Sequence, residues 1–195
     1  MTANRLRIVL DDSEDERNLT PIAGRNNWVH KRSIARSGDQ PEEYVYATRD
    51  GETLIHWIDD HKTGVKYILV DGPEASKVNK LLRDKLLQFA PDYIIEHASE
   101  RDLNSAERRT ALYHLALEKM ERGFDQTTFD LYAAAMKSPD PVVRGGAVLG
   151  SAYLGWSELA EPMRPLAGPD EPDESIRKDA GLLLPRLEKL AASHS

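Results

Sequence analysis

The sequence predicts an α+β fold in which an N-terminal antiparallel β-sheet with a packing helix precedes a region made only of helices. Two observations carry this prediction. Strand-like runs separated by turn signals fill residues 1–90, and alanine and leucine at helical spacing replace them over residues 91–195. We therefore expect two units, with a boundary near residue 90.

Five runs in the first half favour strands. Residues 43–49 and 53–58 flank Asp50-Gly51, a pair that accommodates the positive φ angles of a tight hairpin turn. This pair of runs predicts an antiparallel hairpin. Three further runs are expected to extend the sheet, namely residues 28–35, residues 65–70 and, as an edge strand, residues 5–10.

Apolar residues fall on both faces of these strands, as with Tyr44 and Tyr46 on one face and Val45 and Ala47 on the other. We therefore expect each face to be covered, at least in part. One cover is visible as a helix over residues 74–89, with Pro73 near its start. Its apolar stripe consists of Val78, Leu81, Leu82, Leu86 and Phe89.

Composition excludes several classes of protein. The chain has 195 residues, 40% of them hydrophobic and 30% charged, which is ordinary for a folded soluble protein. It has no cysteine, so disulfides, thiol nucleophiles and iron–sulfur clusters are excluded. The N-terminal apolar run, Ile8 to Leu10, is too short for a signal peptide or a membrane span, and a cytoplasmic location is expected.

The chain carries a net charge of -7, and acidic residues outnumber basic ones in both halves. Because a nucleic-acid binder needs a basic surface to neutralise phosphates, this balance argues against a nucleic-acid partner.

An internal repeat marks the second half. The pattern Asp-x-x-[Val/Ile]-Arg-x-x-Ala-x-Leu begins at Asp140 and again at Asp173, 33 residues later, and a weaker copy begins at Asn104. Asp or Asn can cap a helix N-terminus, and alanine lets two helices approach closely. One face of each helix is expected to pack, in the sets Val143/Ala147/Leu154 and Ile176/Ala180/Leu187. The partner helices are expected over residues 124–137 and 157–167.

This pattern resembles the second-helix signature of HEAT repeats over residues 103–190. The resemblance implies a short α-helical solenoid, whose usual function is to bind another macromolecule. It also implies that Asp140, Arg144, Asp173 and Arg177 link neighbouring repeats through a polar ladder. Three prolines depart from an ideal repeat and indicate shortened or kinked helices: Pro162, Pro165 and Pro185.

Two polar clusters invite an ion-binding interpretation. His56 and His61, with Asp59 between them, could hold a divalent metal. A core-edge histidine beside a polar loop is the favoured alternative, because His56 should lie in a strand and His61 in a turn. The acidic run 11–16 lacks the pattern of a calcium loop. Within it, Ser13-x-x-Glu16 predicts a capping box before a brief helix that ends at Pro21.

No catalytic or cofactor-binding signature is present. There is no Gly-x-Ser-x-Gly and no phosphate-binding glycine loop, so we expect neither an enzyme nor a cofactor. Gly145, Gly146 and Gly150 are interpreted as close-packing points between helices. Trp28 and Trp156 are the candidate partner-binding residues, because tryptophan is enriched at interface hot spots as well as in cores.

These observations favour a non-catalytic protein-binding module of a bacterial cytoplasm, an adaptor or an inhibitor, with an immunity-type inhibitor of a toxin as one specific form. Its acidic balance suits a basic protein partner. The alternative is an enzyme or enzyme subunit on a HEAT-like scaffold, similar to bilin lyases or DNA base-excision enzymes. The oligomeric state does not follow from the sequence.

Overall fold

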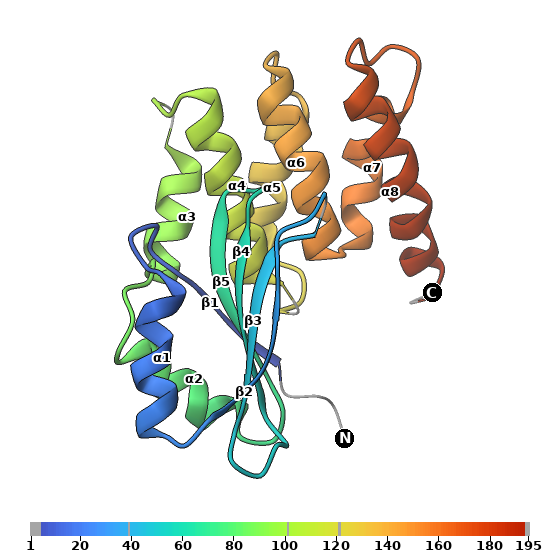
Figure 1. Ribbon diagram of the computed structural model, residues 1–195. Coiled ribbons are helices and arrows are strands. Elements are labelled where there is room, and N and C mark those ends of the chain that lie inside the picture. The colour runs from blue at the N-terminus through green and yellow to red at the C-terminus, as the bar shows by residue number, and fades with distance from the viewer. Residues whose placement is uncertain (1–4, 39, 101, 121, 194–195) are drawn as a thin grey trace. The chain divides into compact units, whose positions relative to one another are not determined.

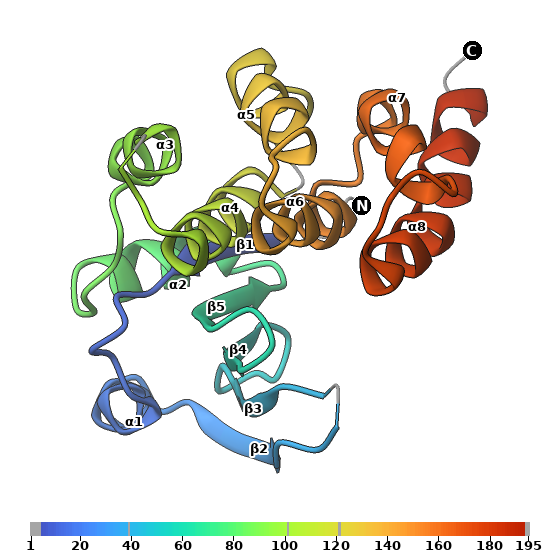
Figure 2. The same ribbon diagram turned by 90° about the horizontal axis from the view of Figure 1, so that it is seen from above.

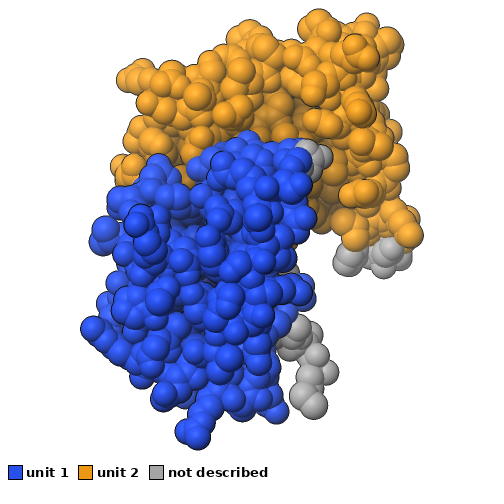
Figure 3. All heavy atoms as spheres, in the orientation of Figure 1, with its two compact units in different colours: residues 1–90 blue, residues 91–195 orange. Residues whose placement is uncertain are grey.

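The computed structural model describes residues 5–38, 40–100, 102–120 and 122–193. The chain divides into two units, residues 1–90 and 91–195, which Figure 3 colours separately. Each unit has its own secondary structure, a sheet with two helices in the first and helices in the second (Figure 1).

Unit 1 contains one five-stranded antiparallel sheet with the strand order β1-β5-β4-β3-β2. The strands are β1 (Arg5–Val9), β2 (Val29–Ile34), β3 (Glu42–Ala47), β4 (Leu54–Asp60) and β5 (Val65–Asp71). All five predicted strands are therefore present. The predicted edge strand, β1, lies beside β5. The Asp50-Gly51 turn closes the β3–β4 hairpin, with Gly51 at φ +80°.

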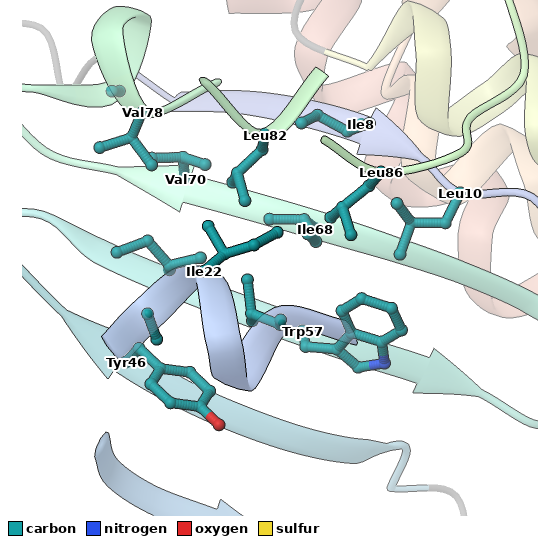
Figure 4. Packing of buried hydrophobic residues seen from close by; sticks show 14 residues of the cluster. Ile8, Leu10, Ile22, Tyr46, Trp57, Ile68, Val70, Val78, Leu82 and Leu86 are labelled. Atoms are coloured by element: carbon teal, nitrogen blue, oxygen red, sulfur yellow. The ribbon is translucent and has the colours of Figure 1, made fainter. Parts of the chain in front are cut away.

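Helices α1 (Glu16–Arg25) and α2 (Ala75–Arg83) pack on the same face of this sheet. Ile22 of α1 and Val78 of α2 lie in one cluster with Trp57 and Ile68 of the sheet (Figure 4). Apolar side chains of the opposite face, such as Val45 and Val65, are also buried. Apolar residues are thus buried on both faces, as incomplete alternation predicts, although Val29 of β2 is 48% exposed.

The prediction for α1 was wrong at both ends. Its N-cap is Asp15, whose carboxylate accepts from the Arg17 N–H, and no capping box forms on Ser13. Pro21 lies inside the helix and does not end it. The helix continues past the proline because Ile22 and Ala23 are buried in the core, which compensates for the missing backbone hydrogen bond.

The helix predicted over residues 74–89 is too long by a turn and a half, since α2 ends at Arg83 and Pro73 precedes its N-cap, Glu74. Tertiary hydrogen bonds explain this early end. The buried Glu14 carboxylate accepts from the Leu87 N–H at 2.6 Å, and the Phe89 N–H donates to the Val9 carbonyl at 3.2 Å. Residues beyond α2 therefore pair with the end of β1.

Unit 2 is built from helices that pair along the chain. They are α3 (Pro91–Ser99), α4 (Ser105–Lys119), α5 (Gln126–Met136), α6 (Pro141–Leu154), α7 (Ala160–Met163) and α8 (Glu174–Ser193), with 3-10 turns η1 (Ser157–Leu159) and η2 (Arg164–Ala167) flanking α7. Contacts join α3 with α4, α5 with α6, and the η1–α7–η2 segment with α8. Figure 2 shows α4, α6 and α8 side by side in one row and α3, α5 and α7 in the other.

The prolines affect the two members of the last helix pair differently. Pro162 and Pro165 lie in the segment that is broken into η1, α7 and η2, as their positions predict. Pro185, by contrast, lies inside the continuous helix α8.

We predict that Gly72→Ala destabilises the protein by about 3 kcal/mol, as expected for strained backbone with a steric clash. Gly72 has φ +140°, and an added Cβ would lie 2.5 Å from the Glu52 carbonyl oxygen. The matched control is Gly51→Ala, because Gly51 also has positive φ but has open space around it. This control should lose only about 1 kcal/mol. Urea unfolding measures both, and equal losses would contradict the clash.

Candidate protein-binding surface of the helical unit

The three repeat copies begin their helices with the same polar cap. Asn104 accepts from the Ala106 and Glu107 N–H groups, both at 3.0 Å. Asp140 accepts from the Val142 N–H at 2.8 Å, and Asp173 accepts from the Ser175 N–H at 2.9 Å. Each cap satisfies backbone donors that a helix start leaves without partners.

The repeat arginine also has one recurring contact. Its guanidinium donates to backbone carbonyls of the turn before its own helix. Arg108 reaches the Glu100 oxygen at 2.7 Å, Arg144 reaches the Ser138 oxygen at 2.9 Å, and Arg177 reaches the Glu171 oxygen at 2.6 Å. The weak first copy thus shares this feature with the two good ones. The arginine fixes the turn that leads into each helix.

A buried ion pair connects two of the copies. Arg144 donates from Nε to Glu171 Oε2 at 3.0 Å and from Nη2 to Glu171 Oε1 at 2.7 Å. Glu171 is 4% exposed and also accepts from the Asp173 N–H. The hydrogen bonds from Arg144 lower the pKa of Glu171. α6 is thereby linked to the turn that begins α8.

Of the four predicted ladder residues, Asp140 and Arg144 therefore contact another copy, and they do so through neighbours that the repeat pattern does not contain. Ser105, at the start of α4, donates to the Asp140 carboxylate, and Glu171 joins Arg144 to the Arg177 turn. Sequence reasoning missed both neighbours, because neither lies at a position that the good copies share.

The packing faces lie where the repeat predicts. Val143, Ala147 and Leu154 of α6 are at most 4% exposed, and Ile176, Ala180 and Leu187 of α8 at most 5%. Gly150 is a close-packing point, since an added Cβ would lie 2.3 Å from the Tyr132 hydroxyl. A Cβ on Gly146 would lie 2.8 Å from Arg109 Cγ, whereas Gly145 has ordinary room beside Ile176.

The last leucine of the repeat is not part of the core. Leu149 is 40% exposed and its counterpart Leu182 is 60% exposed, although α6 and α8 are neighbours. Val142 is 39% exposed and lies seven residues before Leu149, on the same side of α6. A Cβ added at Gly145 would lie 3.6 Å from Ile176 Cγ1, so α6 and α8 approach each other closely there. We name Val142, Leu149 and Leu182 the leucine surface.

Trp156 lies in the turn that follows α6, directly after the C-cap residue Gly155. It is 6% exposed and contacts Phe124, with ring centroids 5.5 Å apart. Phe124 also contacts Phe129, and because Asp125 is the N-cap of α5, these two rings form a hydrophobic staple. Phe124, at 46% exposed, offers more surface to a partner than Trp156 does.

Trp28 belongs to unit 1, where it is half-buried and packs against the sheet core. It lines a cleft of about 530 Å³ together with Arg49, Asp50 and Lys77. A partner-binding role for Trp28 and Trp156 stays a prediction.

The three candidate metal ligands, His56, His61 and Asp59, do not point to a common site. The ring of His56 bonds to Glu43 Oε1, His61 bonds to the Gly38 carbonyl at 3.1 Å, and Asp59 lies 3.6 Å from Arg36. His56 and Asp59 point to opposite faces of the sheet because they are three residues apart in β4. Within the described ranges, no three His, Asp or Glu side chains are grouped to hold a metal ion.

His114 of α4 is a polar residue that the sequence did not single out. It is 5% exposed, and burial lowers its pKa to about 4, so its ring is neutral at pH 7. Glu118, one turn later, is also buried and lies 2.7 Å from Arg122. No sequence signal separates these two residues from polar positions on an exposed helix face.

Comparison with known proteins gives no match to a family model, to a curated protein or to a solved structure. None of the helices in the described part of the chain combines the length and the apolar character needed to cross a membrane.

We predict that Glu171→Gln destabilises the protein by about 3 kcal/mol, because it leaves the buried Arg144 charge without its counterion. The matched control is Glu161→Gln. Glu161 is 87% exposed and lies 3.6 Å from Arg164, so its loss should change stability by less than about 0.5 kcal/mol. Urea unfolding at pH 7 measures both variants, and similar losses would contradict a structural role for the buried pair.

The same pair predicts a dependence of stability on pH. Since the pKa of Glu171 is lower in the folded state than its usual 4.5, its contribution is complete above that value. The contribution is lost as the pH falls through the lowered folded-state pKa. The wild type should therefore lose more stability than Glu171→Gln between neutral and acidic pH. Parallel curves of unfolding free energy against pH would exclude this contribution.

Proposed function

We propose that the chain is a non-catalytic protein-binding module, an adaptor or inhibitor that binds its partner through the leucine surface of a short HEAT-like solenoid. The observation that carries this proposal is the repeated exposure of one leucine position. Leu149 and Leu182 occupy the same place in two successive copies, and both remain open to solvent. An apolar position that recurs without serving the core is typical of a binding surface.

The binding free energy that the leucine surface can supply is too small for a stable complex, so the partner must contact further side chains. Covering the exposed part of each leucine contributes about 1 kcal/mol, roughly half of what full burial gives. The three residues of the leucine surface together therefore fall well short of a micromolar affinity, which needs about 8 kcal/mol. Polar and charged contacts around them must supply specificity and the remaining affinity.

Charge favours a basic partner. The chain carries a net charge of -7 and a sequence pI near 5.4, so long-range attraction accelerates encounter with a basic protein. An immunity-type inhibitor, which neutralises a toxin in the bacterial cytoplasm, is the specific form of this proposal.

We predict that Leu149→Ser with Leu182→Ser weakens partner binding at least tenfold without loss of the fold. The immobilised protein is first used to isolate the partner, which is then purified and titrated calorimetrically into each variant. The matched control is Leu87→Ser in unit 1, because Leu87 is 63% exposed and lies outside the helices. This control should bind within about twofold of the wild type.

Three outcomes would remove the proposal. The double variant could bind the partner as the wild type does. The wild type could bind no protein and instead turn over a small molecule, which would favour an enzyme. Sedimentation could show that the leucine surface joins two copies of this chain, and the occupant would then be a second copy.

A further inference from the structure

Unit 1 contains an acidic cavity of about 260 Å³, which is separate from the cleft beside Trp28. Its walls come from the first turn of α1 and from strands β3, β4 and β5. The principal lining residues are Asp15, Glu16, Glu42, Tyr44, Trp57 and Asp59. We name this site the acidic cavity.

Strand register brings the lining residues together. Tyr44 is the cross-strand neighbour of Trp57, Glu42 is the neighbour of Asp59, and Asp59 is in turn the neighbour of Lys66. Cross-strand neighbours point to the same face of a sheet, so all five residues share one face. This is also the face on which α1 packs.

The lining carries a net negative charge. It contains five carboxylates, those of Glu14 and the four named acidic residues, against the cations Arg17 and Lys66. Both cations are engaged. Lys66 donates to the carbonyls of Asp12 and Glu14, each at 2.8 Å, and Arg17 donates to Asp15 at 2.8 Å. Hydrogen bonds from Arg17 lower the pKa of Asp15 to about 2.

Hydroxyl groups hold two of the carboxylates in place. Tyr44 donates to Glu42 Oε1 at 2.7 Å, and Tyr46 donates to Glu16 Oε1 at 2.5 Å. Asp59 has a looser partner, Arg36, at 3.6 Å. Oxygen atoms with fixed positions are suited to a planar donor that makes several hydrogen bonds at once.

Trp57 gives a second, independent indication of a ligand. Its side chain is 98% buried and lines the cavity, and Figure 4 shows the indole nitrogen pointing away from the apolar cluster. The indole N–H has no hydrogen-bond partner among the residues that the structure describes, and its nitrogen is not fully closed off from solvent. Because this donor lines the cavity and makes no bond to a described residue, the site suits a ligand that carries an acceptor oxygen.

We propose that the acidic cavity binds an arginine side chain of another polypeptide. Its guanidinium group bonds to the carboxylates of Glu42 and Asp59 and contacts the aromatic rings, while a carbonyl oxygen of the same peptide segment accepts from the Trp57 N–H. Guanidinium fits better than ammonium because it is planar, forms paired bonds with carboxylates and stacks on rings. A metal ion fits poorly, since the described carboxylates form no group of three that could hold one. The proposal does not depend on the leucine surface.

The test uses the full chain labelled with ¹⁵N and titrated with N-acetyl-L-arginine amide. Indole N–H resonances report on the three tryptophans, and Trp57→Phe assigns the relevant one. We expect the Trp57 signal to shift to saturation with the arginine probe. The citrulline analogue, which has nearly the same shape without the charge, should leave the signal in place.

Calorimetry with paired variants identifies the residues. Glu42→Gln with Asp59→Asn should weaken the arginine probe at least tenfold. The matched control is Glu52→Gln with Asp84→Asn, which removes the same charge from exposed positions outside the cavity and should bind within twofold of the wild type. If the double variant does not fold, Asp59→Asn alone should still weaken the probe severalfold, since among the described residues the Asp59 carboxylate has only the loose Arg36 ion pair.

Several results would overturn the proposal. Equal shifts from the citrulline analogue would exclude recognition of the charge, and equal losses in the test and control variants would reduce the effect to general electrostatics. Methylguanidinium lacks the peptide carbonyl, so we expect it to bind more weakly than the amide and to be unaffected by Trp57→Phe. Equally tight binding of methylguanidinium would mean that the cavity takes a free guanidino compound and not a polypeptide.

Discussion

The structure of the helical unit depends on how each second helix begins. A helix start leaves N–H groups without partners, and the turn before it leaves carbonyls without partners. Asn104, Asp140 and Asp173 satisfy the first set, and the repeat arginines satisfy the second. Arg144 also forms a buried ion pair with Glu171, and this pair links α6 of one copy to the turn before α8 of the next. The polar residues of the repeat are thus used to fix helix positions.

This use of polar residues determines which side chains stay exposed on the helices. Alanine and glycine occupy the seams between helices, where Ala147 and Ala180 are fully buried. Leucines two residues further along, Leu149 and Leu182, then turn outward and are not required by the core. In unit 1 the equivalent constraint is strand register, which gathers the carboxylates of the acidic cavity next to one buried indole.

Sequence reasoning succeeded where the signal is local. Asp50-Gly51 and the apolar runs predicted the strands, and the spacing of Asp140 and Asp173 predicted both helix starts. It failed where groups that are distant in the sequence determine where a helix ends. Glu14 accepts from the Leu87 N–H across 73 residues and helps end α2 early, and burial of Ile22 carries α1 past Pro21. Glu171 and the acidic cavity were missed because neither follows from spacing, only from packing and register.

If the repeated leucines Leu149 and Leu182 serve binding, as we propose, they should contribute little to folding. The most direct test is the free energy of unfolding of the Leu149→Ser, Leu182→Ser double variant, measured by urea denaturation of the full chain. We expect a change within about 0.5 kcal/mol per site, as for surface substitutions. A loss of about 2 to 3 kcal/mol per site, the size expected for truncated core leucines, would contradict it.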